Sequence, residues 1–340
     1  MSHSRLSILL LCLVGAAHAA PLYTLTKTIP IGAPDRWDLL TFDATSQRVY
    51  IAHGDRVTVV DVQDGKVIGT VEGFTGGTHG VAIVPSLHRG YTDDGQAATA
   101  NSFDVNTFKS LKSIPAADDA DAIVFDPRSR YLFVIDSDPG KITVINPDTD
   151  TVVTTLDGGG KLEIGVADGH GKLFINGEAK REILRIDTRT LDIDARWPIP
   201  DCESPHGIAV DTQHHHVFSS CANQIMVVVS AQDGALLASL PIGARSDGAA
   251  YDPTTQRAFS SNGEGTLTVI GEPTPGKFKV LDNVPTSLGA RTMTIDPRSG
   301  RLFLVTADLK VNEGVDPKDY RHRYTVTPGS AKLLIYEPVQ

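Results

Sequence analysis

A pattern of four short strands returns about every 42 residues along this chain, and it constrains the fold more than any other feature. One complete copy has four β-branched runs separated by turns rich in Asp, Pro and Gly, at 121–126, 131–136, 141–146 and 151–156. Runs of this kind, bounded by such residues, predict β-strands. Four strands in about 40–45 residues is the period of one β-propeller blade, as in WD40-like repeats.

Seven copies of the repeat align on the residue that opens the first strand of each copy. The spacings between these residues are 41, 42, 42, 43, 41 and 44, and the residues are Asp38, His79, Asp121, Glu163, His206, Asp247 and Arg291. Seven copies predict an all-β, seven-bladed β-propeller with four-stranded blades. We expect one domain over residues 20–340, although the length alone suggests about two domains.

The two ends of the repeat array complement each other. The seventh copy supplies three strands and lacks a fourth, whereas residues 22–31 form a strand-like segment ahead of the first copy. We therefore expect the N-terminal strand to complete the last blade and close the ring, which leaves no open edge. The alternative is a sandwich with a stray terminal strand. A polar excursion at 308–330 interrupts the last copy, and its role is either functional or that of a mobile insertion.

The first 19 residues have the pattern of an export signal. Arg5 is followed by an apolar run over 6–14 and by the small-x-small sequence Ala-His-Ala at 17–19. Such a segment predicts a signal peptide cleaved between Ala19 and Ala20, and hence a periplasmic or secreted protein. Beyond it no stretch approaches the ~18 consecutive apolar residues of a membrane span, so we expect no transmembrane segment after cleavage.

The net charge of the chain limits the kinds of partner that we expect it to bind. The chain has 31 Lys and Arg against 41 Asp and Glu, a net charge of −10. A chain this acidic lacks the electrostatic footprint expected of a non-specific nucleic-acid binder, although a local basic cluster of Lys318, Arg321, His322 and Arg323 leaves an interaction module for nucleic acid or the cell envelope as an alternative. We expect a monomer that binds a small polar ligand or a partner protein of the cell envelope.

Several motifs within the repeat are those of a known family. They are Arg56–Asp61 with Gly65–Thr70, Lys141–Asn146, Pro205–Asp211, Ser260–Val269 and Pro328–Ile335. In these motifs the chain resembles the YncE-like, YVTN-repeat family of exported seven-bladed β-propeller proteins, over the whole length that follows the signal segment. The resemblance implies the fold and export. It leaves the activity open, because propellers include ligand binders, lactonases and redox enzymes.

The residues that open the first strands are expected to form a ring at one mouth of the central channel, which these strands line in a propeller. The ring holds four carboxylates, two imidazoles and one guanidinium. The second strands return to the same face and add a further polar set, which includes His53, Asn176 and Asn262. Together these residues predict a site for a polar ligand. The alternative is that polar side chains gather at a wet mouth and neutralise one another.

The same ring contains residue types that can bind a divalent metal ion, although nothing in the sequence requires a cofactor. Histidine with carboxylates suits Zn²⁺, whereas carboxylates with asparagine suit Ca²⁺. The candidate ligands are His79, His206, Glu163 and Asp247, but the two histidines come from nearly opposite blades, which argues against one ion bound by both. A metal would favour a lactonase-type hydrolase in which a ring carboxylate activates water. We favour a non-enzymatic binding or scaffold protein.

Two cysteines remain after the signal segment. Cys202 lies in the connection that enters the fifth blade, and Cys221 ends the second strand of that blade, at the same end. A disulfide needs Cα atoms within roughly 4.4–6.8 Å, which this arrangement allows, and an exported protein folds under oxidising conditions. We therefore predict a Cys202–Cys221 disulfide. The alternative is a metal site formed by Cys221 and His206.

Overall fold

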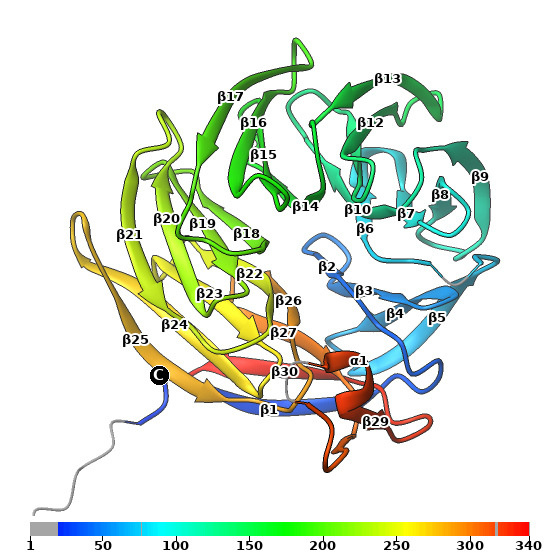
Figure 1. Ribbon diagram of the computed structural model, residues 1–340. Helices are drawn as coiled ribbons and strands as arrows, with labels where there is room; N and C mark the ends of the chain where they lie inside the picture. The colour runs from blue at the N-terminus through cyan, green and yellow to red at the C-terminus, as the bar shows by residue number, and fades with distance from the viewer. Residues whose placement is uncertain (1–19, 76, 317–318, 340) are drawn as a thin grey trace, which may run out of the picture.

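The computed structural model describes residues 20–75, 77–316 and 319–339. They form seven four-stranded sheets arranged as blades around a central channel, which is a seven-bladed β-propeller (Figure 1). The predicted signal peptide, residues 1–19, lies outside the described residues. The described part of the chain contains no helix with the length and apolar character of a membrane span.

Each blade runs from an inner strand at the channel to an outer strand at the rim, and the blades are numbered one to seven in chain order of their inner strands. The inner strands are β2 (Leu40–Asp43), β6 (Val81–Val84), β10 (Ala120–Phe125), β14 (Leu162–Ala167), β18 (Pro205–Asp211), β22 (Ser246–Asp252) and β26 (Thr292–Asp296). The second strands are β3 (Arg48–His53), β7 (Arg89–Asp94), β11 (Leu132–Asp136), β15 (Lys172–Gly177), β19 (His216–Cys221), β23 (Arg257–Asn262) and β27 (Arg301–Thr306).

The third strands are β4 (Arg56–Asp61), β8 (Thr99–Asp104), β12 (Lys141–Asn146), β16 (Glu182–Asp187), β20 (Ile225–Ser230), β24 (Thr266–Thr274) and β30 (Lys332–Pro338). The outer strands are β5 (Lys66–Glu72), β9 (Ser110–Pro115), β13 (Thr151–Asp157), β17 (Asp192–Pro198), β21 (Leu236–Pro241), β25 (Lys277–Pro285) and β1 (Tyr23–Pro30). A short 3-10 helix, η1 (Pro85–Leu87), joins β6 to β7.

The aspartate that recurs at the end of the inner strands shapes the turn that follows. The carboxylate of Asp252 accepts a hydrogen bond from the backbone N–H of Thr254 at 2.9 Å, and that of Asp296 accepts one from Arg298 at 3.1 Å. A side chain that bonds to the backbone two residues on fixes a tight turn. This explains why the repeat can be recognised by an aspartate in front of its second strand.

The apolar core is divided into seven clusters, and in the described residues each cluster lies between two neighbouring blades. Between blades seven and one, for example, Phe303 and Val305 of β27 pack with Val49 and Ile51 of β3. A middle strand such as β11 is buried on both faces. Its sequence is therefore a continuous apolar run rather than an alternating one.

The outer strand of blade seven comes from the N-terminus. β1 pairs antiparallel with β30, from Tyr23 opposite Pro338 to Pro30 opposite Lys332, so the sheet order is β1-β30-β27-β26. Figure 1 shows the blue N-terminal strand beside the red C-terminal strand. Tyr23 and Ile29 are the two buried side chains of β1. They enter the core clusters on the two sides of blade seven.

The polar excursion at 308–330 contains a hairpin. β28 (Leu309–Val311) pairs with β29 (Tyr324–Val326), and the short helix α1 (Tyr320–Arg323) precedes β29. The carboxylate of Asp35 accepts hydrogen bonds from the backbone N–H of Gly329 at 2.8 and 2.9 Å. This contact ties the end of the excursion to the segment that leads into blade one.

Cys202 and Cys221 form the predicted disulfide, with their Cα atoms 5.2 Å apart and both residues buried. The bond links the connection ahead of β18 to the end of β19. Because it uses the sulfur of Cys221, the alternative metal site of Cys221 with His206 is not formed.

Candidate functional site at the channel mouth

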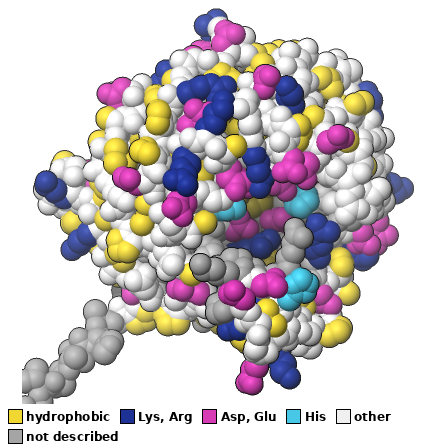
Figure 2. Space-filling model, in the orientation of Figure 1, with side chains coloured by type: hydrophobic (Ala, Val, Ile, Leu, Met, Phe, Trp, Pro, Cys, Tyr) yellow, Lys and Arg dark blue, Asp and Glu magenta, His cyan; other side chains and the backbone are white. Residues whose placement is uncertain are grey.

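The seven residues that open the repeats lie where the inner strands begin. Four of them are the second residue of their inner strand, and the other three come one or two residues ahead of it. Neighbouring blades are linked at this level, since Leu39 N–H donates to the carbonyl of His79 at 2.9 Å. Figure 2 shows acidic, basic and histidine side chains around a hollow in the middle of this face.

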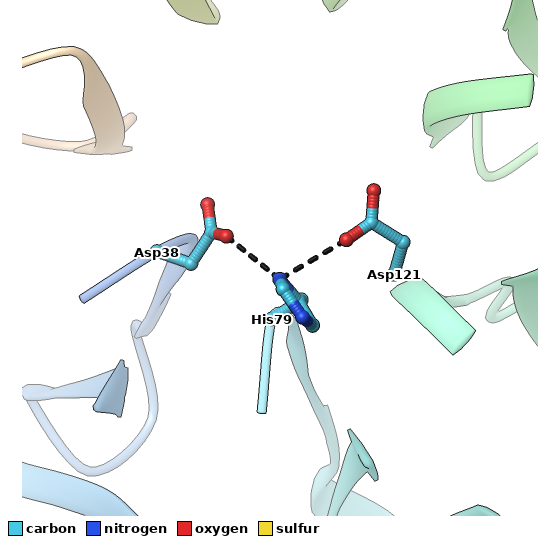
Figure 3. A group of neighbouring side chains, drawn as sticks. All are labelled: Asp38, His79 and Asp121. Carbon is cyan, nitrogen blue, oxygen red and sulfur yellow. Dashed lines mark hydrogen bonds and ion pairs between the residues drawn. The ribbon is translucent and has the colours of Figure 1, made fainter. Parts of the chain in front are cut away.

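His79 lies between two carboxylates from the neighbouring blades. Its Nδ1 is 2.8 Å from Oδ2 of Asp38 and 3.0 Å from Oδ1 of Asp121. Figure 3 shows both contacts meeting at the same nitrogen, with the two aspartates on either side of the ring. The ligand-capable atoms of these three residues lie within 4.8 Å of one another, and the described residues contain no other such group.

Burial and charge oppose each other at this histidine. Burial alone would lower the pKa of His79, but the hydrogen bond and charge of Asp38, together with the charge of Asp121, raise it to about 9. Burial raises the pKa of Asp121 to about 7, although His79 partly offsets this effect. At pH 7 the imidazole is therefore a cation between the carboxyl groups of Asp38 and Asp121.

A buried carboxylate fixes the backbone at His79. Asp93, which is fully buried on β7, accepts hydrogen bonds from His79 N–H at 2.6 Å and from Gly80 N–H at 2.8 Å. Burial raises the pKa of Asp93 well above its usual range. A Cβ on Gly80 would lie 2.9 Å from the backbone nitrogen of Ile123, so only glycine allows β10 to approach this closely.

His206 repeats the arrangement on the other half of the ring with longer contacts. Its Nδ1 lies 3.5 Å from Oε2 of Glu163 and 3.4 Å from Oδ1 of Asp247, and it has no hydrogen-bond acceptor of its own. Burial would lower the pKa of His206, but the contact with Glu163 and the charge of Asp247 raise it to about 9. This half also contains Arg291, whose Nε lies 2.9 Å from Oδ2 of Asp247.

Three residues that the sequence analysis did not select extend this half of the ring. Lys161 Nζ lies 2.6 Å from Oε2 of Glu178 and 3.4 Å from Oε1 of Glu163. Ser204 Oγ donates to Glu178 and lies 3.2 Å from Nε2 of His206. Burial would raise the pKa of Glu178, but the hydrogen bonds from Lys161 and Ser204 lower it to about 2. The result is a network of fixed, compensated charges.

A cavity of about 800 Å³ opens beside His206, Asp247 and Arg291. Its other walls include Trp37, from the segment ahead of blade one, and Tyr324, from the hairpin of the excursion. The guanidinium of Arg245, another lining residue, lies 4.5 Å from the centre of the Tyr324 ring. The excursion is therefore part of a cavity wall.

Below the ring the channel becomes apolar. A second cavity of about 530 Å³ is lined by the residues that follow the ring positions along the inner strands, among them Leu39, Gly80, Ala122, Ile164 and Gly248. The mouth therefore offers charged groups to a ligand, whereas the interior of the channel is lined mainly by apolar residues and glycines, with Thr41, Thr294 and Asp168 as its polar side chains.

The second polar set does not join the ring. His53, Asn176 and Asn262 are fully buried within their blades. Nδ2 of Asn176 donates to the carbonyl of His206 at 2.8 Å, and Nδ1 of His53 lies 2.8 Å from Oγ1 of Thr58. Burial lowers the pKa of His53 to about 4, so the imidazole of His53 is neutral at pH 7. These three side chains brace the strands that carry the mouth.

The four predicted metal ligands are divided between the two halves. His79 belongs to the close group with Asp38 and Asp121, whereas Glu163, His206 and Asp247 form the other, looser cluster. The structure thus places the two histidines in separate clusters.

Comparison with known proteins relates the chain to YncE. No family model matches it. Over 207 residues it is 26% identical to "Uncharacterized protein YncE" of Salmonella typhi and 25% identical to the protein of the same description in Salmonella typhimurium. Each match covers 58% of this chain and 57% of the relative, so the matched region spans less than two thirds of the relatives' length. This similarity and the seven-bladed ring support a YncE-like propeller.

Among solved structures, hydrazine synthase of Kuenenia stuttgartiensis aligns with a TM-score of 0.70, over 86% of this chain and 96% of that chain. The sequences are 16% identical over this alignment. At that identity the comparison shows a shared fold alone.

Proposed function

We propose that this protein is an exported β-propeller that binds a small organic ligand carrying a carboxylate or phosphate group at the mouth of its channel. The observation that supports this most directly is the cavity of about 800 Å³ at the charged ring. Sites for small molecules in proteins are typically concave and of about 300–1,000 Å³. The signal-like segment at 1–19 supports export.

The charges and rings of this cavity define the class of ligand. Arg36, Arg245 and Arg291 reach its walls from three separate segments. Asp247 holds Arg291 through Nε, and 47% of the Arg291 side chain remains exposed. A guanidinium is suited to paired hydrogen bonds with a carboxylate or phosphate. Trp37 and Tyr324 would contact the apolar body of the same ligand.

The hydrogen bonds of Ser204 favour a binding function over nucleophilic catalysis. Its distance of 3.2 Å to His206 resembles the start of a Ser-His-acid triad. However, the hydroxyl donates to Glu178, and the pKa of His206 is raised to about 9, so that the imidazole already carries the proton that a general base would have to accept. His206 lines the cavity, and we therefore assign Ser204 and Glu178 to the network that holds it.

A lactonase-type hydrolase is the second candidate function from the sequence. It requires a metal ion in the ring to activate water beside the ligand. Incubation of the purified protein with a panel of lactones, with and without a chelator, distinguishes the two proposals. Turnover that the chelator abolishes would replace the binding function with an enzymatic one.

The binding function is tested with a panel of small carboxylic acids and phosphate esters, using thermal unfolding as the measure. We expect at least one compound to raise the melting temperature of the wild type and to have at least about tenfold lower affinity for Arg291→Gln. Arg130→Gln is the matched control, because Arg130 is an exposed arginine paired with Asp148 and does not line the cavity. If no compound binds, or if both variants bind alike, the proposal is wrong.

A further inference from the structure

We propose that Asp38, His79 and Asp121 form a binding site for one divalent transition-metal ion of the Zn²⁺ class. The site belongs to blades one to three. The proposed ligand cavity lies against His206, Asp247 and Arg291 of blades five to seven and reaches Trp37, next to Asp38, so the two sites adjoin but use different side chains, and the inference goes beyond the proposed function.

Two of the three pairs of ligand atoms are already close to the separation that such an ion needs, and the third, between the oxygens of Asp38 and Asp121, lies within 4.8 Å and would have to close by up to about 1.4 Å. Tetrahedral zinc has ligands at about 2.0–2.2 Å, which places any two of them about 3.3–3.5 Å apart. Nδ1 of His79 lies 2.8 and 3.0 Å from the oxygens of Asp38 and Asp121. Both pairs therefore need to open by only about half an ångström. The ion would take the place of the Nδ1 proton, which passes to solvent.

The two halves of the ring differ in the cations fixed beside their carboxylates. In the Glu163–His206–Asp247 half, Lys161 lies 3.4 Å from Glu163 and Arg291 lies 2.9 Å from Asp247. In the described residues no lysine or arginine pairs within 4 Å with Asp38 or Asp121, and His79 is the cation between them. The half with the shorter contacts thus has only His79 as a close cation, and Arg291 acts on its carboxylates at longer range, so a divalent ion that replaces the Nδ1 proton would add one positive charge there.

The backbone around His79 is fixed before any ion binds. Asp93 holds the N–H groups of His79 and Gly80, and the carbonyl of His79 accepts from Leu39 N–H at 2.9 Å. These contacts tie β2, β6 and β7 together at the level of the three ligands. A rigid first shell lowers the cost of ordering ligands around a metal.

The ligand set selects the class of metal. One imidazole and two carboxylates suit Zn²⁺ and its neighbours in the transition series, whereas Ca²⁺ takes six to eight oxygen ligands. The side chains of Asp38, His79 and Asp121 are 21, 18 and 30% exposed, so a fourth position remains open to water at the mouth. Three protein ligands with an open position is the pattern of a reactive rather than a purely structural metal.

The test uses untagged full-length mature protein, stripped with a chelator and titrated with ZnCl₂ in a calorimeter. We expect one ion per chain for the wild type. Asp121→Asn and His79→Ala should each raise the dissociation constant by at least about 100-fold, since each removes a metal ligand rather than a residue that positions one. His206→Ala, the matched control in the other half, should keep the wild-type affinity. Co²⁺ should give the visible absorption of a four-coordinate complex, and lose it in Asp121→Asn.

A second control addresses the exposed histidines of the turn before β19, on the opposite face. His214→Ala with His215→Ala should leave the stoichiometry unchanged. The proposal is overturned if the wild type binds no stoichiometric zinc, or if either control abolishes binding. It is also overturned if Asp121→Asn binds as the wild type does. Should His79→Ala fail to fold, Asp121→Asn decides the question, because the amide has the size and shape of the carboxylate.

Discussion

At the scale of single residues, the mouth is built from histidines that each precede a glycine. A Cβ on Gly80 would lie 2.9 Å from the backbone nitrogen of Ile123, and a Cβ on Gly207 would lie 2.7 Å from that of Ala249. The missing side chain lets the next inner strand approach, and the carboxylates of neighbouring blades then meet the imidazole. A His-Gly pair at the opening of an inner strand is therefore the local sequence signal for both clusters, since the pairs His53-Gly54 and His170-Gly171 lie elsewhere in their blades.

The raised pKa of His206 predicts how stability depends on pH. A histidine whose folded pKa is about 9, against an ordinary value of 6.5, stabilises the fold fully below pH 6.5 and loses that contribution as the pH rises to 9. We expect the free energy of unfolding of the metal-free protein to fall by about 1–3 kcal/mol over this range. Urea unfolding across the range measures it.

His206→Gln should flatten this pH dependence in part, because His79 has the same raised pKa and remains in place. The control is His170→Gln, since His170 is exposed on a turn. A wild type whose stability is constant or rises between pH 6.5 and 9 would contradict the assigned ion pairs.

The Cys202–Cys221 disulfide predicts a second change in stability. It closes a loop of 19 residues, and a loop of this length contributes about 3 kcal/mol or somewhat less. Cys202→Ser with Cys221→Ser should lower the free energy of unfolding by about 2–3 kcal/mol, measured by urea unfolding. Titration of denatured, unreduced wild type should find no thiol, and two thiols would show that the bond is absent.

At the scale of elements, two segments outside the regular repeat complete the molecule. β1 supplies the outer strand of blade seven and buries Tyr23 and Ile29. The β28–β29 hairpin adds nothing to a blade but forms a wall of the mouth cavity. The first segment therefore matters for stability and the second for binding.

Ile29→Ala tests the contribution of β1. Ile29 is buried with Val49 and Leu333, so its truncation leaves a cavity and should destabilise the protein by about 2–5 kcal/mol. Thr28→Ala is the control, because Thr28 is exposed on the same strand and its change should stay within about 0.5 kcal/mol. Equal losses in urea unfolding would mean that the strand contributes no buried contact.

Replacing 312–323 by Asn-Gly tests the hairpin. Val311 pairs with Tyr324, so a two-residue turn can join them directly. We expect the circular dichroism spectrum and the melting temperature to stay close to those of the wild type, because the seven blades are untouched. The hairpin residues that line the cavity, Leu309, Tyr324 and Val326, are kept, so this variant should bind the acids found in the thermal panel as the wild type does. Tyr324→Ala, which removes a lining ring, should weaken their binding at least about tenfold, and unchanged binding by Tyr324→Ala would exclude the excursion from the site.

At the scale of the whole molecule, the repeat predicts the fold better than it predicts the site. The spacing places Asp38, Asp121 and Asp247 at the same height in the ring, since it fixes where each inner strand begins. The spacing does not fix how far a side chain lies from the channel axis. His53 and Asn262 were therefore expected at the mouth, whereas in the structure they are buried inside their blades.

The repeat also gave no indication of the long side chains that reach the ring from outside the aligned positions. Lys161 and Glu178 reach the ring from loops, and their reach depends on rotamers that no periodicity encodes. The only sequence signal for them is charge next to a ring position, as Lys161 stands two residues before Glu163. Such charges are common on solvated turns, so the signal is weak.

The proposed export of the protein can be tested by identifying the N-terminal residue of the purified protein. Expression of the full chain should yield periplasmic or secreted protein whose first residue is Ala20, because cleavage follows the Ala-His-Ala sequence. Mass spectrometry of the purified protein identifies the terminus, and light scattering should find the mass of a single chain. An uncleaved cytoplasmic product would contradict the export proposal.

The pairing of β1 with β30 also imposes an order in time. Thr26 donates to the carbonyl of Ile335, a residue 309 positions later, so the first strand to be synthesised waits for the last. At about 5–20 residues per second, this wait lasts from about 15 seconds to a minute. Between Tyr23 and Ile29, β1 is exposed and carries Thr24, Thr26, Lys27 and Thr28, with Leu25 as its one exposed apolar residue. We expect the mainly polar surface that faces solvent at the rim of the finished ring to keep the unpaired strand soluble until its partner is made.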